Sequence, residues 1–101
     1  MIEIPRHNAR IYWSDALQRR GLPTSLRGID PAWPAGATPV VDEGWSLVYE
    51  FDHAPSEQGS PSLARVGFLM EAAPHTALAA GARLQLHERG TQQYALVEIL
   101  D

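Results

Sequence analysis

The chain has 101 residues, a net charge of −4 and no cysteine, and 45% of its residues are hydrophobic. This composition is typical of one globular domain covering residues 1–101, and it excludes disulfides, thiol catalysis and cysteine-ligated metals. No stretch is long and apolar enough to span a membrane, no signal peptide is recognisable, and the net charge argues against nucleic-acid binding. The sequence therefore predicts a cytoplasmic protein that binds neither nucleic acid nor membrane.

The first two elements are a strand and a short helix. Apolar residues alternate with polar ones over residues 8–13, which predicts a half-buried strand. Ser14 then has the character of an N-cap, and Asp15 would lie in the first turn, where a negative charge suits the helix dipole. Gly21 is a good helix terminator, so we expect one short helix near residues 15–20.

Residues 22–39 contain four prolines and two glycines, and this predicts an irregular loop. A short strand over residues 38–41 and a turn over 42–44 would follow it. Trp33 stands between two prolines inside this loop, so we interpret it as an exposed anchor for a partner, since tryptophan and arginine carry much interface energy. Arg27 and Tyr12 are predicted to complete that patch.

The most regular strand is predicted over residues 44–52. Its apolar face is rich in aromatic side chains and is expected to hold much of the core. That face consists of Trp45, Leu47, Tyr49 and Phe51. The opposite face is mostly polar and carries Glu50 and Asp52, and residues 53–62 form a polar loop after it.

Three further strands are expected over residues 64–70, 82–87 and 94–100, with a hairpin turn over 88–91. The pattern predicts a mainly β protein, a small antiparallel β-barrel of about six strands. The last strand has Ala95, Val97 and Ile99 on one face. Its other face is also partly apolar, which favours a homodimer.

The C-terminal part of the chain carries a strand, a glycine step, a second strand, a charged glycine turn and a final strand. The residues that form this pattern are Ala64, Val66 and Phe68, then Ala72-Ala73-Pro74, then Leu78-Ala79-Ala80-Gly81-Ala82-Arg83-Leu84-Gln85-Leu86, then Glu88-Arg89-Gly90. Residues 63–100 thus resemble the C-terminal β-barrel domain of elongation factor Tu and related translation GTPases. The resemblance implies a closed antiparallel barrel used as a binding platform, and the absence of a P-loop means that it implies no GTPase activity.

No catalytic or metal-binding motif is recognisable. The chain lacks H-E-x-x-H, G-x-S-x-G and G-x-G-x-x-G patterns, and its four histidines show no ligand spacing. We therefore predict no enzymatic activity, no cofactor and no metal. One alternative stays open: Glu50 and Asp52, two apart on a strand, could join His53 in a small enzyme or ligand-binding barrel.

The favoured hypothesis is a non-catalytic protein-binding module that contacts its partner through residues 22–39 and 53–62. The predicted contact residues are Tyr12, Arg27, Trp33, Glu50 and Asp52. A second alternative is an immunity or inhibitor protein that neutralises a toxin. Its acidic residues could face a basic nuclease, and they are Glu43, Glu50, Asp52 and Glu57.

Overall fold

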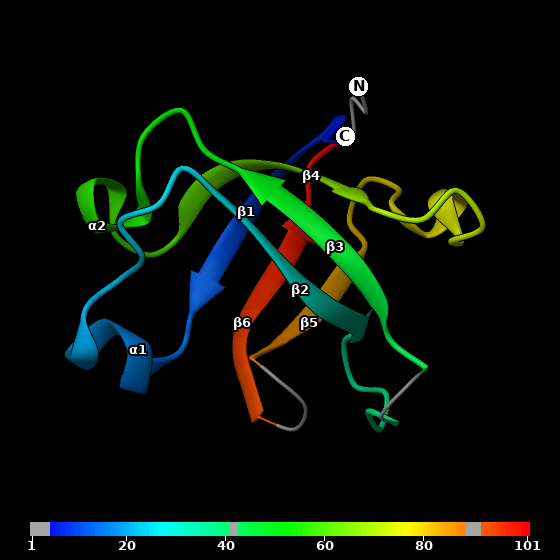
Figure 1. Ribbon diagram of the computed structural model, residues 1–101, viewed down its shortest axis with the longest axis horizontal. Coiled ribbons are helices and arrows are strands. Elements are labelled where there is room, and N and C mark those ends of the chain that lie inside the picture. The colour runs from blue at the N-terminus through cyan, green and yellow to red at the C-terminus, as the bar shows by residue number, and fades with distance from the viewer. Residues whose placement is uncertain (1–4, 41–42, 89–91) are drawn as a thin grey trace.

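The structure, a computed structural model, describes residues 5–40, 43–88 and 92–101. Six antiparallel strands close into a barrel in the order β1-β4-β3-β2-β5-β6 (Figure 1). The strands are β1 (His7–Trp13), β2 (Arg27–Pro34), β3 (Trp45–Glu50), β4 (Ser62–Phe68), β5 (Arg83–Glu88) and β6 (Gln92–Ile99). The remaining elements are the helices α1 (Asp15–Arg20) and α2 (Pro55–Gln58) and the 3-10 turn η1 (His75–Ala77). The predicted mainly β barrel is confirmed.

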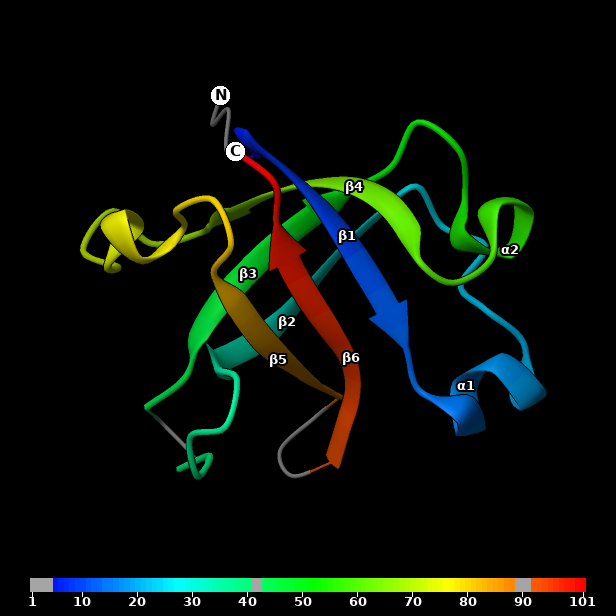
Figure 2. The same ribbon diagram turned by 180° about the vertical axis from the view of Figure 1, so that it is seen from behind.

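The first and last strands close the barrel. β1 pairs with β4 on one side, with Ala9 opposite Ala64, and with β6 on the other, with Ala9 opposite Ile99. Viewed from behind, β1, β6 and β5 lie next to one another (Figure 2). This order places β1 beside β4 rather than beside β2, which is a Greek-key arrangement.

Alternating apolar side chains fill the barrel, as the period of two predicts. The aromatic face of β3 points inward, and Leu47 and Phe51 are buried there. Ile11, Val97 and Ile99 meet it from β1 and β6, and each is at most 1% exposed. The outer face of β3 is less exposed to solvent than expected, because Val48 is also fully buried.

The short helix α1 forms as its caps predict. The Ser14 hydroxyl accepts a hydrogen bond from the Leu17 N–H at 3.2 Å, and Asp15 lies in the first turn. Gly21 ends the helix with φ at 119°, a value that favours glycine, and its N–H donates to the Leu17 carbonyl. No helix in the described part of the chain is long and apolar enough to cross a membrane.

The prediction of an irregular loop over residues 22–39 is wrong, because β2 occupies its centre. Pro31 is tolerated in β2 because its nitrogen lies on an edge of the strand where no ladder bond is needed. The predicted short strand over residues 38–41 is not found in 38–40, and residue 41 lies outside the described residues. Parts of the two predicted turns, namely residue 42 and residues 89–91, also lie outside the described residues.

Trp33 is buried, so its prediction as an exposed anchor is wrong. Its side chain is 7% exposed and lies on the outer face of β2, where its ring centroid is 4.8 Å from that of His87. Gln85 connects the turn after β2 to this pair, since its amide donates to the carbonyls of Pro34 and Ala37 and its amide oxygen lies 2.8 Å from the His87 Nε2. Trp33 thus belongs to a small packed cluster outside the barrel.

Candidate functional site

Among the described residues, β2 is paired along only part of one of its two sides. This strand pairs with β3 from Arg27 to Ala32 but with β5 only from Ala32 to Pro34. Its N-terminal half, which crosses the front of the barrel in Figure 1, therefore has no described strand on its second side. We call residues 27–31 along that side the open edge.

Two hydrogen bonds establish which backbone groups face the open edge. The Phe51 N–H donates to the Leu26 carbonyl at 2.8 Å, so Leu26 turns its backbone toward β3. The Ala35 N–H donates to the Arg83 carbonyl at 3.0 Å, so Ala35 turns its backbone toward β5. Because backbone groups of a strand alternate between its two sides, Arg27, Ile29 and Pro31 face the open edge. Arg27 and Ile29 offer both donor and acceptor there, and Pro31 offers only its carbonyl.

The outer face of the open edge is apolar and basic. Ile29 on this face is 52% exposed, and Leu26, which precedes the strand and has the opposite parity, is 55% exposed. Arg27 is exposed and forms no ion pair with any residue in the described ranges. Arg27, one of the predicted contact residues, therefore lies at the open edge.

The inner side of the open edge borders a pocket of about 200 Å³ between β2, β3, β6 and α1. We call it the tyrosine pocket, and its lining comprises Leu17, Arg20, Pro23, Asp30, Tyr49 and Tyr94. The Asp30 carboxylate accepts hydrogen bonds from the hydroxyls of Tyr49 and Tyr94, which lie 3.0 Å from each other. Three polar groups from three strands thus converge at this end of the barrel.

Tyr94 points into the barrel because of a bulge in β6. The register between β5 and β6 shifts after Leu86, which pairs with Ala95, so that His87 pairs with Gln93 and leaves Tyr94 without a partner. Tyr94 therefore lies inward like Ala95, although strict alternation along β6 would place it on the opposite face. Burial, followed by the neighbouring Tyr49 and Asp30, raises the pKa of Tyr94 far above its usual value, so its hydroxyl stays protonated.

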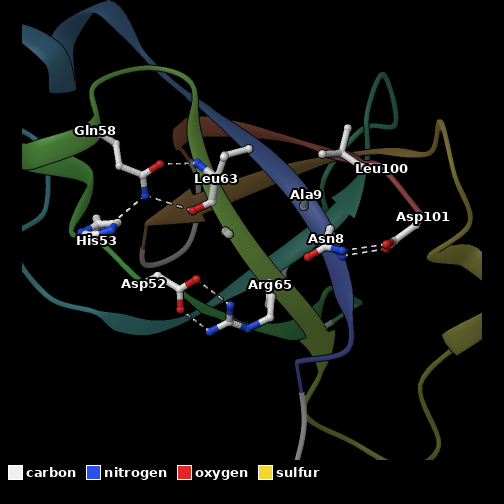
Figure 3. Close-up of a pocket in the computed structure, with 10 residues that line it drawn as sticks. Asn8, Ala9, Asp52, His53, Gln58, Leu63, Arg65, Leu100 and Asp101 are labelled. Atoms are coloured by element: carbon white, nitrogen blue, oxygen red, sulfur yellow. Dashed lines mark hydrogen bonds and ion pairs between the residues drawn. The ribbon is translucent and has the colours of Figure 1, made fainter.

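A second depression, of about 430 Å³, lies across β4 between the loop after β3 and the C-terminal residues (Figure 3). We call it the Arg65 groove, and its lining comprises Asn8, Ala9, Asp52, His53, Gln58, Leu63, Ala64, Arg65, Leu100 and Asp101. It includes Asp52 from the predicted contact residues and His53 from the ligand-binding alternative.

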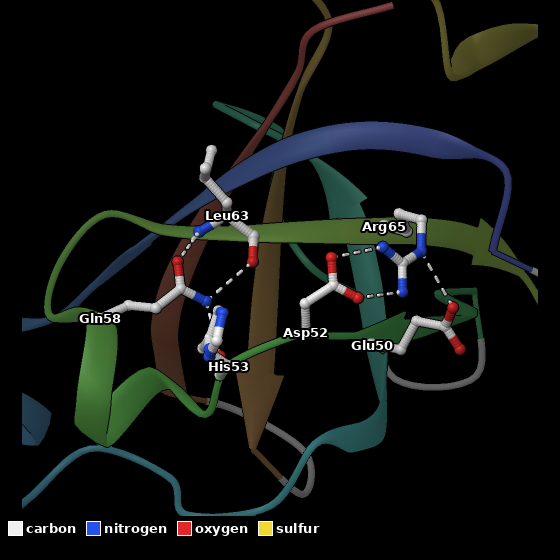
Figure 4. Close-up of polar contacts among 6 residues, drawn as sticks. All are labelled: Glu50, Asp52, His53, Gln58, Leu63 and Arg65. Carbon is white, nitrogen blue, oxygen red and sulfur yellow. Dashed lines mark hydrogen bonds and ion pairs between the residues drawn. The ribbon is translucent and has the colours of Figure 1, made fainter.

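Glu50 and Asp52 come together as predicted, but Arg65 holds both of them (Figure 4). The Arg65 Nε donates to Glu50 at 3.1 Å, and its two terminal nitrogens bind Asp52 at 3.1 and 3.0 Å. These hydrogen bonds and the arginine charge hold the pKa of Asp52 below its usual value. A carboxylate kept ionised in this way is poorly suited to act as a general acid.

The Gln58 side chain satisfies the backbone hydrogen-bonding groups of β4 at Leu63 (Figure 4). Its amide oxygen accepts from the Leu63 N–H at 2.8 Å, and its amide nitrogen donates to the Leu63 carbonyl at 3.0 Å. The same nitrogen donates to the His53 carbonyl at 2.6 Å. Because β3 pairs with β4 only as far as Arg65, the Gln58 side chain takes the place of a neighbouring strand at Leu63.

The predicted patch of Tyr12, Arg27 and Trp33 does not form. Tyr12 lies on β1, which stands three strands from β2 in either direction around the barrel, and its hydroxyl donates to Glu98 at 3.3 Å. Trp33 is covered, as described above. Within residues 5–40, 43–88 and 92–101, no three histidine or acidic side chains gather closely enough to hold a metal ion.

Sequence reasoning missed Asp30, Tyr49 and Tyr94 as a polar cluster. Asp30 shares the inward parity of Ala32, which would have been visible once residues 27–34 had been recognised as a strand. The bulge that turns Tyr94 inward leaves no comparable signal, because it depends on the pairing with β5.

The class that the fold and this geometry define is a closed six-stranded antiparallel barrel with one partly unpaired strand. No protein-family model, curated protein or solved structure matches the chain. The resemblance of residues 63–100 to the elongation factor Tu barrel therefore stays a prediction.

Proposed function

We propose that this protein is a non-catalytic binding module that holds another protein against the open edge of β2. The observation that carries the proposal is the unequal pairing of β2, which has β3 along six residues on one side and β5 along three on the other. Unpaired backbone groups of an exposed strand are a ready template for another chain. The exposed side chains of Arg27 and Ile29 flank these groups.

The Arg65 groove offers fewer free groups to a partner. The polar side chains of Arg65, Asp52 and Gln58 bind one another or the local backbone, and Asn8 donates to Asp101 at 2.7 Å. A partner that bound here would have to break these contacts or leave them buried. The open edge is therefore the better contact surface of the two predicted segments.

The same contacts weigh against the two alternatives. An inhibitor of a basic nuclease needs free carboxylates, and Arg65 already binds two of the four predicted ones, Glu50 and Asp52, which leaves Glu43 and Glu57. In a catalytic site at His53, Asp52 could not serve as the general acid, because Arg65 holds the pKa of its carboxyl below the usual value.

Affinity capture with matched variants tests the proposal. The wild-type protein, Ile29→Ser and Leu63→Ser would serve as baits in cells that express the protein. Leu63 is a suitable control because it is 60% exposed, as Ile29 is 52% exposed, and it lies in the Arg65 groove. We expect a stoichiometric partner with the wild type and Leu63→Ser that is lost with Ile29→Ser. Loss with Leu63→Ser alone, or no partner with any bait, would show the proposal to be wrong.

A further inference from the structure

We infer that the partner binds as an added β-strand along the open edge and that it carries an acidic and an apolar residue two positions apart. The inference rests on the proposed function and specifies how the contact is made. Strand addition is a common way to bind extended peptides, in which backbone hydrogen bonds supply affinity and alternate side chains supply specificity.

The backbone groups at the open edge determine the size of the partner segment. Arg27 and Ile29 each present an N–H and a carbonyl, and Pro31 presents a carbonyl only, because of the alternation established by the bonds of Leu26 and Ala35. Up to five hydrogen bonds can therefore form. A segment of about five residues, roughly 17 Å long, would cover this edge. Longer pairing is prevented at one end, where β5 takes over at Ala32.

The outer side chains determine the chemistry of that segment. Arg27 and Ile29 are two residues apart on the outer face, and both are exposed. Partner side chains that lie opposite them on this face must also be two residues apart. An acidic residue matches Arg27, because this guanidinium has no ion pair within the described residues, and an apolar residue matches Ile29.

The partner residue between these two faces inward. It would lie opposite Gly28 and next to the tyrosine pocket, where the Asp30 carboxylate is already bonded to Tyr49 and Tyr94. The limited volume of about 200 Å³ favours a small or polar side chain there. The expected segment is thus acidic–x–apolar in a parallel partner or apolar–x–acidic in an antiparallel one.

The strand geometry can be tested separately from the surface. Ile29→Pro removes the N–H that faces the open edge and leaves the β2–β3 ladder intact, because that ladder uses the backbone groups of Gly28 and Asp30. Ile29→Val keeps the N–H and a similar side chain and is the matched control. The probe is a library of random linear peptides selected on the wild-type protein, with folding of each variant checked by urea denaturation.

We expect selected peptides with the acidic and apolar residues two positions apart. They should bind Ile29→Val within threefold of the wild type, and Ile29→Pro and Arg27→Glu at least tenfold more weakly. A second readout does not depend on any variant: bound peptide should slow hydrogen exchange of the Arg27 and Ile29 amides at least tenfold and leave those of Gly28 and Asp30 unchanged.

The outcomes separate this inference from the proposed function. If a partner is lost with Ile29→Ser but the Arg27 and Ile29 amides gain no protection, the surface binds proteins without strand addition, and the inference is wrong. Selection of no peptide, or of peptides that bind folded Ile29→Pro as well as Ile29→Val, also overturns it. The affinity capture tests the proposed function itself, with Leu63→Ser as its control.

Discussion

Replacing Gly28 by alanine should destabilise the protein through a single neighbour. A Cβ at this position would lie 2.5 Å from the Cζ and hydroxyl atoms of Tyr49, well inside contact distance. Gly28 lies in β2 and does not have a positive φ, so its backbone conformation is compatible with alanine. Alanine in a strand is favoured over glycine by about 0.5–1 kcal/mol. Any loss of stability therefore measures the displacement of the Tyr49 ring.

The magnitude follows from what holds that ring. Its hydroxyl donates to Asp30, and its centroid lies 5.7 Å from that of Phe51. Overpacking costs about 1–3 kcal/mol, and leaving a buried polar group unpaired costs about as much. After the alanine gain, we expect Gly28→Ala to lower the free energy of unfolding by about 2–4 kcal/mol.

Urea denaturation of a double-mutant cycle measures this effect. In the Tyr49→Ala background the ring is absent, so Gly28→Ala should cost nothing or add up to about 1 kcal/mol of stability. A folded Gly28→Ala protein as stable as the wild type, or an equal loss in both backgrounds, would refute the reasoning that Gly28 exists to admit Tyr49.

Three further substitutions test other contacts. Trp33→Ala should lower the free energy of unfolding by about 3–5 kcal/mol, whereas an exposed tryptophan would cost at most about 0.5 kcal/mol, and urea denaturation distinguishes the two. Arg65 lowers the pKa of Asp52, so the unfolded chain binds that proton more tightly than the folded one. The stability that the pair contributes is therefore present above the unfolded pKa and is lost as the pH falls through the folded pKa. Asp52→Asn should accordingly flatten the pH dependence of the urea denaturation midpoint between about pH 5 and 2. Gln58→Met should lower stability by about 1–2 kcal/mol and speed hydrogen exchange at the Leu63 amide, and unchanged exchange there would contradict its role as a strand substitute.

Local patterns were sufficient to predict most of the barrel. The alternation around Leu47 and Val97 predicts inward faces, and Ser14 and Gly21 predict both ends of α1, because these signals depend on neighbours in sequence. The structure agrees at each of these positions. The barrel could be predicted for this reason, whereas its open edge could not.

The errors lie where distant residues decide the outcome. Pro31 suggests a loop, and only the missing pairing with β5 on its side of β2 explains how a strand accommodates it. Trp33 is apolar on an outer face, and only the turn that bonds to Gln85 shows that it is covered. The polar cluster around Asp30 depends on a bulge in β6, which is a property of the pairing and not of either strand alone.

The position of β1 between β4 and β6 has a consequence for synthesis. Ala9 pairs with Ile99, so the first strand of the barrel obtains its second neighbour only when the last strand of the barrel has been made. At about 5–20 residues per second this delay is on the order of seconds, much longer than hairpin formation. During that time a nascent sheet of β1 to β4 exposes unpaired edges on both sides, so this barrel is expected to complete its fold only once β6 has emerged and to need protection until then.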